Sequence, residues 1–364
     1  MSAHLEFYRG KTVLVTGGAG AIGSNLCTRL AELGARIVIL DDLSSSYEWN
    51  IPKASEILFV KGCVTDEICL KRVFNEDPQI VIHLAAFFAN QNSVDFPERD
   101  LHVNGLGTLR LLQYSRMNRV DRFVYASSGC SIYGHAAPLP LREEYMSMNL
   151  STPYQITKML GELYGNFFAN NYGMKVVKAR FFNSFGPGEV PGQYRNVIPN
   201  FIYWGLKGMP LPITGNPDAT RDFTWVGDLV DGILRAGFVE AAIGQEFNLA
   251  SGKEVRIGDL ASTINRLTGN KAKTVMGAKR LWDNKSRILA SLERSSKVLG
   301  YAPSMNFEEG LSRTVDWFRS NWEQIDRSAS FLGASSAVRG QITATSRDGE
   351  KRPSSTRRRT TTKA

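Results

Sequence analysis

The chain has little of what marks a membrane or secreted protein. None of its uncharged apolar runs approaches about 18 residues, and its first residues contain no apolar signal core. Its four cysteines, Cys27, Cys63, Cys69 and Cys130, are scattered without metal-ligand spacing, so we expect reduced thiols and no metal site. These absences favour a cytoplasmic protein with no membrane partner.

Positive charge is concentrated at the C-terminus. The formal net charge is +9, but residues 327–364 hold nine Lys and Arg against two acidic residues, which leaves about +2 for the remainder. That balance does not support nucleic-acid binding. Because residues 327–364 are rich in Ser, Thr and Arg and poor in apolar residues, we expect a disordered basic tail. Hydrophobic residues make up 43% of the chain, enough to bury a large core. The part before this tail is long enough for one large domain or two closely joined ones.

A glycine-rich turn between an apolar run and an amphipathic segment is the most informative stretch. Its sequence is Val-Leu-Val-Thr-Gly-Gly-Ala-Gly-Ala-Ile-Gly, with Gly17, Gly20 and Gly23 spaced as in a dinucleotide-binding loop. One glycine permits the turn, one lets the backbone approach a pyrophosphate, and one lets the helix pack against the strand. The next apolar run ends in Asp41 and Asp42, where a carboxylate accepts from the adenosine ribose and favours NAD over NADP.

Short apolar runs alternate with helical patterns through the first half of the chain. The apolar runs lie near residues 13–16, 37–40, 58–60, 80–84, 123–125 and 175–181, and helical patterns cover 67–74, 97–116 and 153–171. This alternation predicts an α/β fold, a Rossmann-type doubly wound parallel sheet with functional loops at the carboxyl ends of the strands.

Glycine and proline interrupt the chain after Asn183, which predicts a smaller C-terminal α/β substrate domain. Helical patterns at 223–237, 257–268 and 308–322 and an apolar run at 246–250 follow. We therefore expect an NAD-binding domain over residues 10–183, completed by about 223–250. The substrate domain would comprise residues 184–222 and 251–325.

Tyr154 and Lys158 are predicted to share one face of a helix that begins at Pro153. A lysine cation beside the phenol would lower the pKa of Tyr154 and prepare it as a general base. The preceding apolar run leads into Ser127 and Ser128, so a hydroxyl at the end of a strand could complete a proton relay. An ordinary surface Tyr–Lys pair is the alternative.

In order and spacing, these motifs resemble the extended short-chain dehydrogenase/reductase family, and within it the NAD-dependent nucleotide-sugar epimerases and dehydratases. The resemblance covers about residues 10–320. It rests on Thr16–Gly23, Asp41–Leu43, His83–Ala86, Ser127–Ser128 with Tyr133–Gly134, Tyr154 with Lys158, Arg180–Asn183 with Gly186–Pro187, Arg221–Phe223 and Leu299–Gly300.

The resemblance implies two sets of binding residues and a homodimer formed through helices near 101–114 and 156–168. The cofactor NAD would be lined by Gly17, Gly20, Ala21, Ile22, Gly23, Asp41, Asp42, Leu43, Cys63, Val64, Leu84, Ala85, Ala86, Asn104, Tyr154, Lys158 and Phe181. A nucleotide-diphosphate sugar would meet Phe88, Ser128, Cys130, Asn183, Val197, Arg221 and Arg287, the arginines suiting phosphate. An ion pair with Asp222 or Asp228 is the alternative for Arg221, and a structural ion pair is likewise the alternative for Arg287.

Three departures from the family pattern bear on the reaction. Gly129 stands where relatives often carry the catalytic Ser or Thr, so Ser128 is expected to supply the hydroxyl. Cys63 stands where an acid often follows the third strand. The acids that 4,6-dehydratases use are replaced by Cys130 and Ser131, and epimerisation at C4 needs neither acid.

We therefore expect an NAD-dependent nucleotide-sugar 4-epimerase that works through a transient 4-keto intermediate. Tyr154 would be the base, Lys158 would tune its pKa, and Ser128 would relay the proton. One alternative is a dehydratase or 3,5-type epimerase that uses Cys130. An alternative of another class is a non-catalytic NAD-binding sensor or scaffold.

Overall fold

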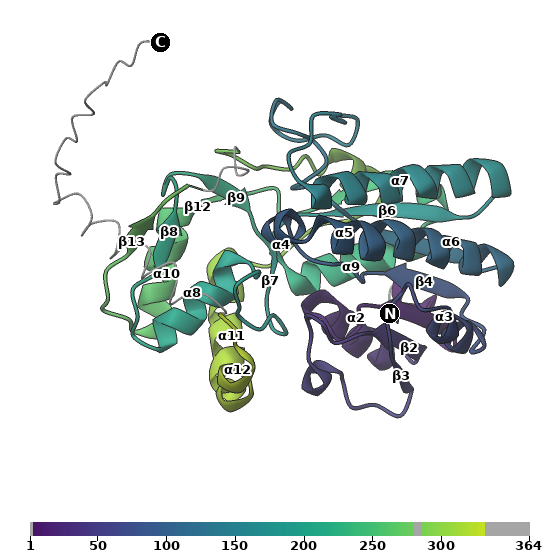
Figure 1. Cartoon of the computed structure of the whole chain (residues 1–364), viewed down its shortest axis with the longest axis horizontal. Helices are drawn as coiled ribbons and strands as arrows, with labels where there is room; N and C mark the ends of the chain where they lie inside the picture. Colours follow the sequence, from purple (N-terminus) through teal and green to yellow (C-terminus); the bar gives the residue numbers. More distant parts are fainter. Residues whose placement is uncertain (1–2, 280–284, 332–364) are drawn as a thin grey trace, which may run out of the picture.

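The computed structural model describes residues 3–279 and 285–331 (Figure 1). Its centre is a seven-stranded sheet in the order β11-β6-β5-β4-β1-β2-β3, with every neighbouring pair parallel. The strands are β1 (Thr12–Thr16), β2 (Arg36–Asp41), β3 (Ile57–Lys61), β4 (Ile80–His83), β5 (Arg122–Ser128), β6 (Val176–Phe181) and β11 (Glu246–Leu249). The strand order reverses between β1 and β4, as in a doubly wound sheet, so the predicted fold class is confirmed.

Helices cover both faces of the sheet, which explains why its strands are almost wholly apolar. On one face, Val13 and Val15 of β1 pack in a buried cluster with α2 (Ala21–Glu32) and α9 (Val226–Phe238). On the other face, Leu14 packs in a cluster with α3 (Glu67–Phe74), α6 (Thr108–Met117) and α7 (Pro153–Tyr172). Side chains of successive residues in a strand point to opposite faces of the sheet, so β1 contributes residues to both clusters.

The helix α7 begins and ends where its sequence indicates. Pro153 occupies its first turn, the side chain of Thr152 accepts a hydrogen bond from the Gln155 N–H, and Gly173 ends it with φ +67°. The helix expected over 97–116 is instead divided into α5 (Pro97–Asp100), a π-helical turn η2 (Leu101–Gly107) and α6. A π-helical turn shifts the side chains that follow it, and such turns are frequent at functional sites.

A smaller domain lies beside the carboxyl end of the sheet (Figure 1). Its core joins Phe201, Ile264 and Phe318 from three helices. Its elements are β7 (Ser184–Phe185), α8 (Val197–Leu206), β8 (Pro212–Thr214), β9 (Thr220–Asp222), β10 (Thr224–Trp225), β12 (Glu254–Arg256), α10 (Ile257–Thr268), β13 (Val275–Gly277), α11 (Phe307–Ser320) and α12 (Trp322–Ser328). The short strands pair as β7·β10, β8·β13 and β9·β12.

Folded structure extends past residue 325, where the substrate domain was expected to end. Helix α12 runs to Ser328, and the ring of Phe331 lies 5.4 Å from that of Tyr203. The rest of the expected tail, residues 332–364, lies outside the described residues. The remaining elements are α1 (Ala3–Glu6), η1 (Glu48–Asn50), α4 (Asn90–Asp95), η3 (Glu240–Ala242) and η4 (Ser295–Leu299). In the described part of the chain, no helix has the length and apolar character to cross a membrane.

Candidate active site

A pocket lies at the carboxyl ends of the parallel strands, and the glycine-rich turn forms part of its wall. Gly17 has φ +73°, and a Cβ on it would come within 2.7 Å of the Ala85 nitrogen. A Cβ on Gly23 would stand 2.2 Å from the Gly17 oxygen, so α2 can pack there only with glycine. A Cβ on Gly20 would touch only the Gly17 oxygen, at 3.3 Å, and otherwise faces open space. Glycine is therefore required for the turn at Gly17 and for helix packing at Gly23, and Gly20 leaves open space at the start of α2.

The N-terminus of α2 suits a bound diphosphate. Its N-cap residue Gly20 provides no side-chain cap, and its first turn contains no acidic residue. The first N–H groups of a helix have no intrahelical partner, and the helix dipole favours anions there. The residues present thus fit the pyrophosphate of a dinucleotide.

The carboxylate of Asp41 shapes the adenosine end of this pocket. It accepts hydrogen bonds from the Ala19 N–H at 3.0 Å, the Leu43 N–H at 2.9 Å and the Ser46 hydroxyl at 2.7 Å. A carboxylate offers about four acceptor positions, so it retains capacity for a ribose hydroxyl. Asp42 also lines the pocket, whereas Leu43 does not. The neighbouring hydroxyls of Ser44, Ser45 and Ser46, which were not predicted, line it as well.

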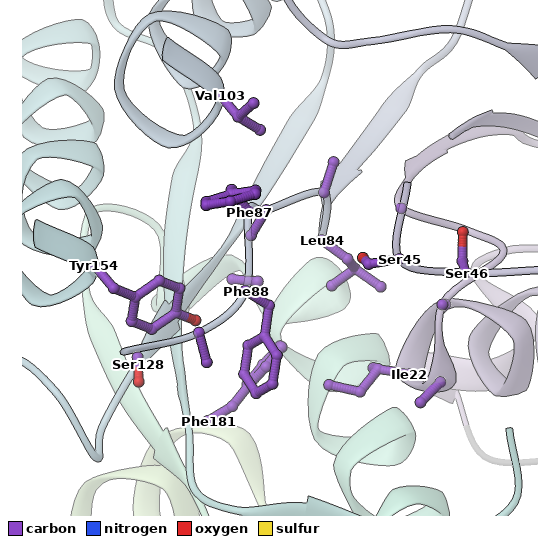
Figure 2. A pocket seen from close by; sticks show the side chains of 18 of the residues that line it. Ile22, Ser45, Ser46, Leu84, Phe87, Phe88, Val103, Ser128, Tyr154 and Phe181 are labelled. Atoms are coloured by element: carbon purple, nitrogen blue, oxygen red, sulfur yellow. The ribbon is translucent and has the colours of Figure 1, made fainter. Parts of the chain in front are cut away.

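Tyr154 and Lys158 line the same pocket from α7, together with Ser128 from the end of β5. Figure 2 shows Tyr154 and Ser128 towards one end and Ser45 and Ser46 towards the other. The Lys158 Nζ lies 5.6 Å from the centre of the Tyr154 ring and donates a hydrogen bond of 2.9 Å to the Ala126 carbonyl. The predicted Tyr–Lys pair is therefore not an exposed surface pair, because both side chains are buried.

The electrostatics of this pair differ from the expectation. The pKa of Tyr154 was expected to be lowered by Lys158. Burial raises it, and the charges of Asp100 and Cys130 act in the same direction. Burial also lowers the pKa of Lys158 to about 8, although the carboxylate of Asp100 opposes that fall. The spacing of Tyr154 and Lys158 was predicted correctly. The direction of the Tyr154 shift was not, because desolvation and the neighbouring acidic groups all raise its pKa.

The end of β5 supplies the Ser128 hydroxyl, and side-chain packing explains the departure at Gly129. Ser128 Oγ donates to Ser131 Oγ at 2.9 Å, and both residues are buried. A Cβ on Gly129 would lie 1.9 Å from Cε2 of the Phe182 ring, so no Ser or Thr fits there without rearrangement. The adjacent Cys130 has a pKa that burial raises.

A second cavity of about 410 Å³ opens beside the first and shares Phe88, Cys130 and Asn183 with it. Val197 at the start of α8 also lines it. Its described lining contains no acidic residue and includes four cationic side chains, Arg195, Arg221, Lys279 and Lys285. Of these four, only Arg221 was predicted. A cavity with this charge suits a diphosphate.

Besides Leu43, two predicted contact residues, Arg287 and Asn104, line neither pocket. Arg287 lines neither pocket; its side chain is more than half exposed, and Nε and Nη2 donate to the Glu254 carboxylate at 2.9 and 2.5 Å. Asn104 is buried behind the pocket wall, where Oδ1 accepts from the Phe87 N–H at 2.8 Å. Arg287 is thus held by an acid distant in sequence, and Asn104 supports the loop that forms the wall.

The remaining predicted cofactor residues do line the first pocket. They are Ala21, Ile22, Cys63, Val64, Leu84, Ala85, Ala86 and Phe181. The pocket also contains an acidic residue that was not predicted, Glu189, whose pKa burial raises to about 7. In the parts of the chain that the structure describes, no three His, Cys, Asp or Glu side chains group as metal ligands would.

Comparison with known proteins agrees with this geometry. Residues 13–250 match the NAD dependent epimerase/dehydratase family. A UDP-glucose 4-epimerase of Mycolicibacterium smegmatis is 35% identical over 310 residues, 84% of this chain and 98% of that protein.

Two solved structures are similar throughout their length. An epimerase from Methanothermobacter thermautotrophicus is 55% identical, with a TM-score of 0.89 over 90% of this chain and 98% of that one. The UDP-glucose 4-epimerase of Thermotoga maritima, solved with UDP-glucose, is 32% identical, with a TM-score of 0.81 over 85% of this chain and 99% of that one. The chain therefore belongs to the NAD-dependent epimerase/dehydratase family.

Proposed function

We propose that this protein is an NAD-dependent nucleotide-sugar 4-epimerase acting on a UDP-hexose. One observation carries the proposal: Tyr154, Lys158 and Ser128 line the pocket of the glycine-rich turn, and that pocket meets a cation-lined cavity at Cys130 and Asn183. The Mycolicibacterium smegmatis relative and the Thermotoga maritima structure, both covered almost completely, are UDP-glucose 4-epimerases. Residues 10–183 and 223–250 would hold NAD, and residues 184–222 and 251–325 the sugar nucleotide.

In this proposal, Tyr154 removes the proton from O4 of the sugar while C4 is oxidised to a ketone. NAD, when bound, supplies the hydride acceptor for that oxidation and a positive charge that offsets the burial of the phenol. Lys158 favours the ionised form of Tyr154, and Ser128 holds the O4 oxygen. The 4-keto sugar then turns about its diphosphate and is reduced on its other face, with Tyr154 returning the proton. Inversion at C4 follows.

Epimerisation accounts for the loop after β5 better than elimination does. Elimination needs an acid and a base at neighbouring carbons, and this loop offers Cys130 and Ser131 in place of carboxylates. The hydroxyl of Ser131 is hydrogen-bonded to Ser128. Burial raises the pKa of Cys130, which disfavours the thiolate that a base would require.

The diphosphate would bind in the second cavity, close to Arg195 and Arg221. Arg221 lines this cavity while its Nη1 donates to the Thr220 carbonyl at 2.9 Å. Its neighbour Asp222 accepts from the Ser251 N–H at 2.9 Å and the Gly252 N–H at 3.1 Å. The carboxylate of Asp222 thus orders the loops behind the cavity. Arg221 lines that cavity, where its guanidinium would meet phosphate oxygens.

The experiment is to incubate the protein with NAD and a panel of nucleotide sugars and to identify the products by NMR. We expect interconversion of UDP-glucose and UDP-galactose, or of their N-acetylated forms. The Tyr154→Phe variant should lose about 10²–10⁴-fold in kcat while retaining NAD. Tyr172→Phe, a half-exposed tyrosine at the end of the same helix, is the matched control. NAD binding with no product from any sugar would instead favour a sensor or scaffold.

A homodimer is part of the proposal. Leu101, Ile156, Leu163 and Phe167 are about half exposed on η2 and α7, a larger apolar surface than isolated side chains would give. A second copy of the chain would cover this face by pairing these helices. Light scattering at micromolar concentration should give a dimer, and Leu163→Asp should give a monomer; a wild-type monomer would contradict the proposal.

We also propose a cytoplasmic location, in keeping with the four free cysteines.

A further inference from the structure

Residues 328–331, which we call the C-terminal clasp, begin at the last residue of α12 and contact two loops that line the pockets. At its first residue, the Ser328 carbonyl accepts a hydrogen bond of 2.7 Å from the Tyr47 hydroxyl. The Ser328 hydroxyl accepts one of 3.3 Å from the Trp49 indole N–H. The Trp49 ring in turn stacks on that of Trp317 in α11, with centres 6.2 Å apart.

The loop that contains Tyr47 and Trp49 forms the adenosine side of the cofactor pocket. In the same loop, the Ser46 hydroxyl bonds to Asp41. Asn50 donates both to the Ala19 carbonyl, at 3.1 Å, and to the Gly188 carbonyl, at 3.0 Å. The clasp is thus connected to the glycine-rich turn through one short loop.

The other end of the clasp contacts the loop that lines the substrate cavity. The Ser330 carbonyl accepts a hydrogen bond of 2.9 Å from the Gln193 N–H, and Ser330 forms a parallel β-bridge with Gly192. The side chain of Asn200 in α8 accepts a hydrogen bond of 2.9 Å from the Gly192 N–H and donates one of 3.0 Å to the Gly192 carbonyl. The residues that follow, Tyr194 to Val197, line the cavity, and Arg195 lines both pockets.

Phe331 anchors the clasp on the small domain. Its ring centre lies 5.4 Å from those of both Tyr203 and Trp204, two neighbours in α8. Trp204 also lines the substrate cavity. A single side chain therefore holds the clasp against the wall of the cavity to which the clasp is hydrogen-bonded.

We propose that the C-terminal clasp fixes two loops, residues 44–50 beside the cofactor pocket and residues 192–196 beside the substrate cavity. NAD and the nucleotide sugar would then bind to loops that are already ordered. Loss of the clasp would then weaken binding of both ligands and leave the chemical step unchanged. This inference goes beyond the proposed function and depends on it only where turnover is measured.

The test uses the full-length chain with Phe331→Ala and measures the dissociation constants of NAD and of UDP by calorimetry. We expect the dissociation constant of UDP to rise about tenfold, because ordering a loop and its side chains on binding costs that much affinity. The constant for NAD should rise by a smaller factor. KM for the sugar nucleotide should rise in parallel, with kcat within about twofold of wild type.

Three further variants separate positioning from simple loss of structure. Phe331→Tyr keeps the ring and should keep wild-type affinities. Phe238→Ala removes a partly buried phenylalanine that packs on Phe7, away from both loops, and should change only stability. Tyr47→Phe removes the bond at the other end of the clasp, and its effect should be less than additive with that of Phe331→Ala.

The outcomes distinguish this inference from the proposed function. Unchanged NAD and UDP affinities in a folded Phe331→Ala protein would overturn the clasp. If the protein converts no sugar nucleotide but shows the expected shifts in affinity, the role proposed for the clasp is supported and the proposed epimerase activity is contradicted. Should UDP fail to bind even the wild-type protein, the NAD measurement alone decides.

Discussion

Replacing Asp100 by asparagine tests how buried charges around Lys158 set the pH range of activity. Asp100 is fully buried, and its carboxylate accepts hydrogen bonds of 2.7 Å from both the Thr157 hydroxyl and the Asn104 amide. Its charge opposes the fall that burial imposes on the pKa of Lys158, which is about 8. Asparagine has the same shape, and the Thr157 hydroxyl can turn to accept a hydrogen bond, so the packing should persist.

Without that carboxylate, the pKa of Lys158 should fall from about 8 to about 7, because one lost charge near a buried group is worth about 1.4 kcal/mol. At pH 8 the cationic fraction of Lys158 would then drop from about a half to about a tenth. We expect kcat/KM at pH 8 to fall about fivefold. At pH 6, Lys158 is charged in both proteins, and kcat/KM should be nearly equal.

The other titratable groups that face Lys158 do not disturb this comparison. Burial raises the pKa values of Tyr154 and Tyr125 and lowers that of His83 to about 3, so none of them titrates between pH 6 and 8. Glu189, with a pKa of about 7, titrates alike in both proteins.

The assay is the initial rate of epimerisation from pH 6 to pH 9, with the exposed Asp316→Asn on α11 as control. We expect the alkaline decline of kcat/KM to move to lower pH in Asp100→Asn alone. Superimposable profiles for wild type and Asp100→Asn would refute the role of Asp100 as the charge partner of Lys158.

Three other substitutions test the site. Gly23→Ala puts a methyl group 2.2 Å from the Gly17 oxygen and should abolish NAD binding in a calorimetric titration; normal affinity would contradict the packing described for α2. Gly129→Ala forces a methyl group into the Phe182 ring and should lower the free energy of unfolding by about 1–3 kcal/mol in denaturant titration. A free energy of unfolding equal to that of the wild type would show that the Phe182 ring can move aside. Cys130→Ala should keep kcat within about twofold, whereas a loss of about a hundredfold would favour proton donation by the thiol.

The sheet and the cofactor turn could be predicted because their determinants are local in sequence. Each strand is a short apolar run, and the glycine-rich turn has a recognisable spacing between a strand and a helix. The helix expected at 97–116 is interrupted at its middle, where its sequence still has helical periodicity. Asn104 in the π-helical turn bonds to Phe87, a contact between distant residues that no local pattern reveals.

The substrate side was harder to predict because its charges are partnered across long stretches of chain. Arg287 resembles a phosphate ligand in sequence, yet Glu254 holds it through two bonds at the surface. Arg195 has no motif around it and nevertheless lines both pockets, because the loop before α8 brings it there. Sequence spacing gives the residue types available for binding a diphosphate. Tertiary packing decides which of them face the cavity.

The pair formed by Tyr154 and Lys158 shows where a correct motif stops predicting chemistry. Spacing four residues apart puts both side chains on one helix face, which is a property of the helix alone. Their protonation depends on everything packed around them: burial disfavours charge on either group, and Asp100 opposes the phenolate while it favours the ammonium. For Tyr154, both effects favour the neutral phenol. Because a general base must be ionised, ligand binding has to change the charge balance of this pocket before O4 can lose its proton.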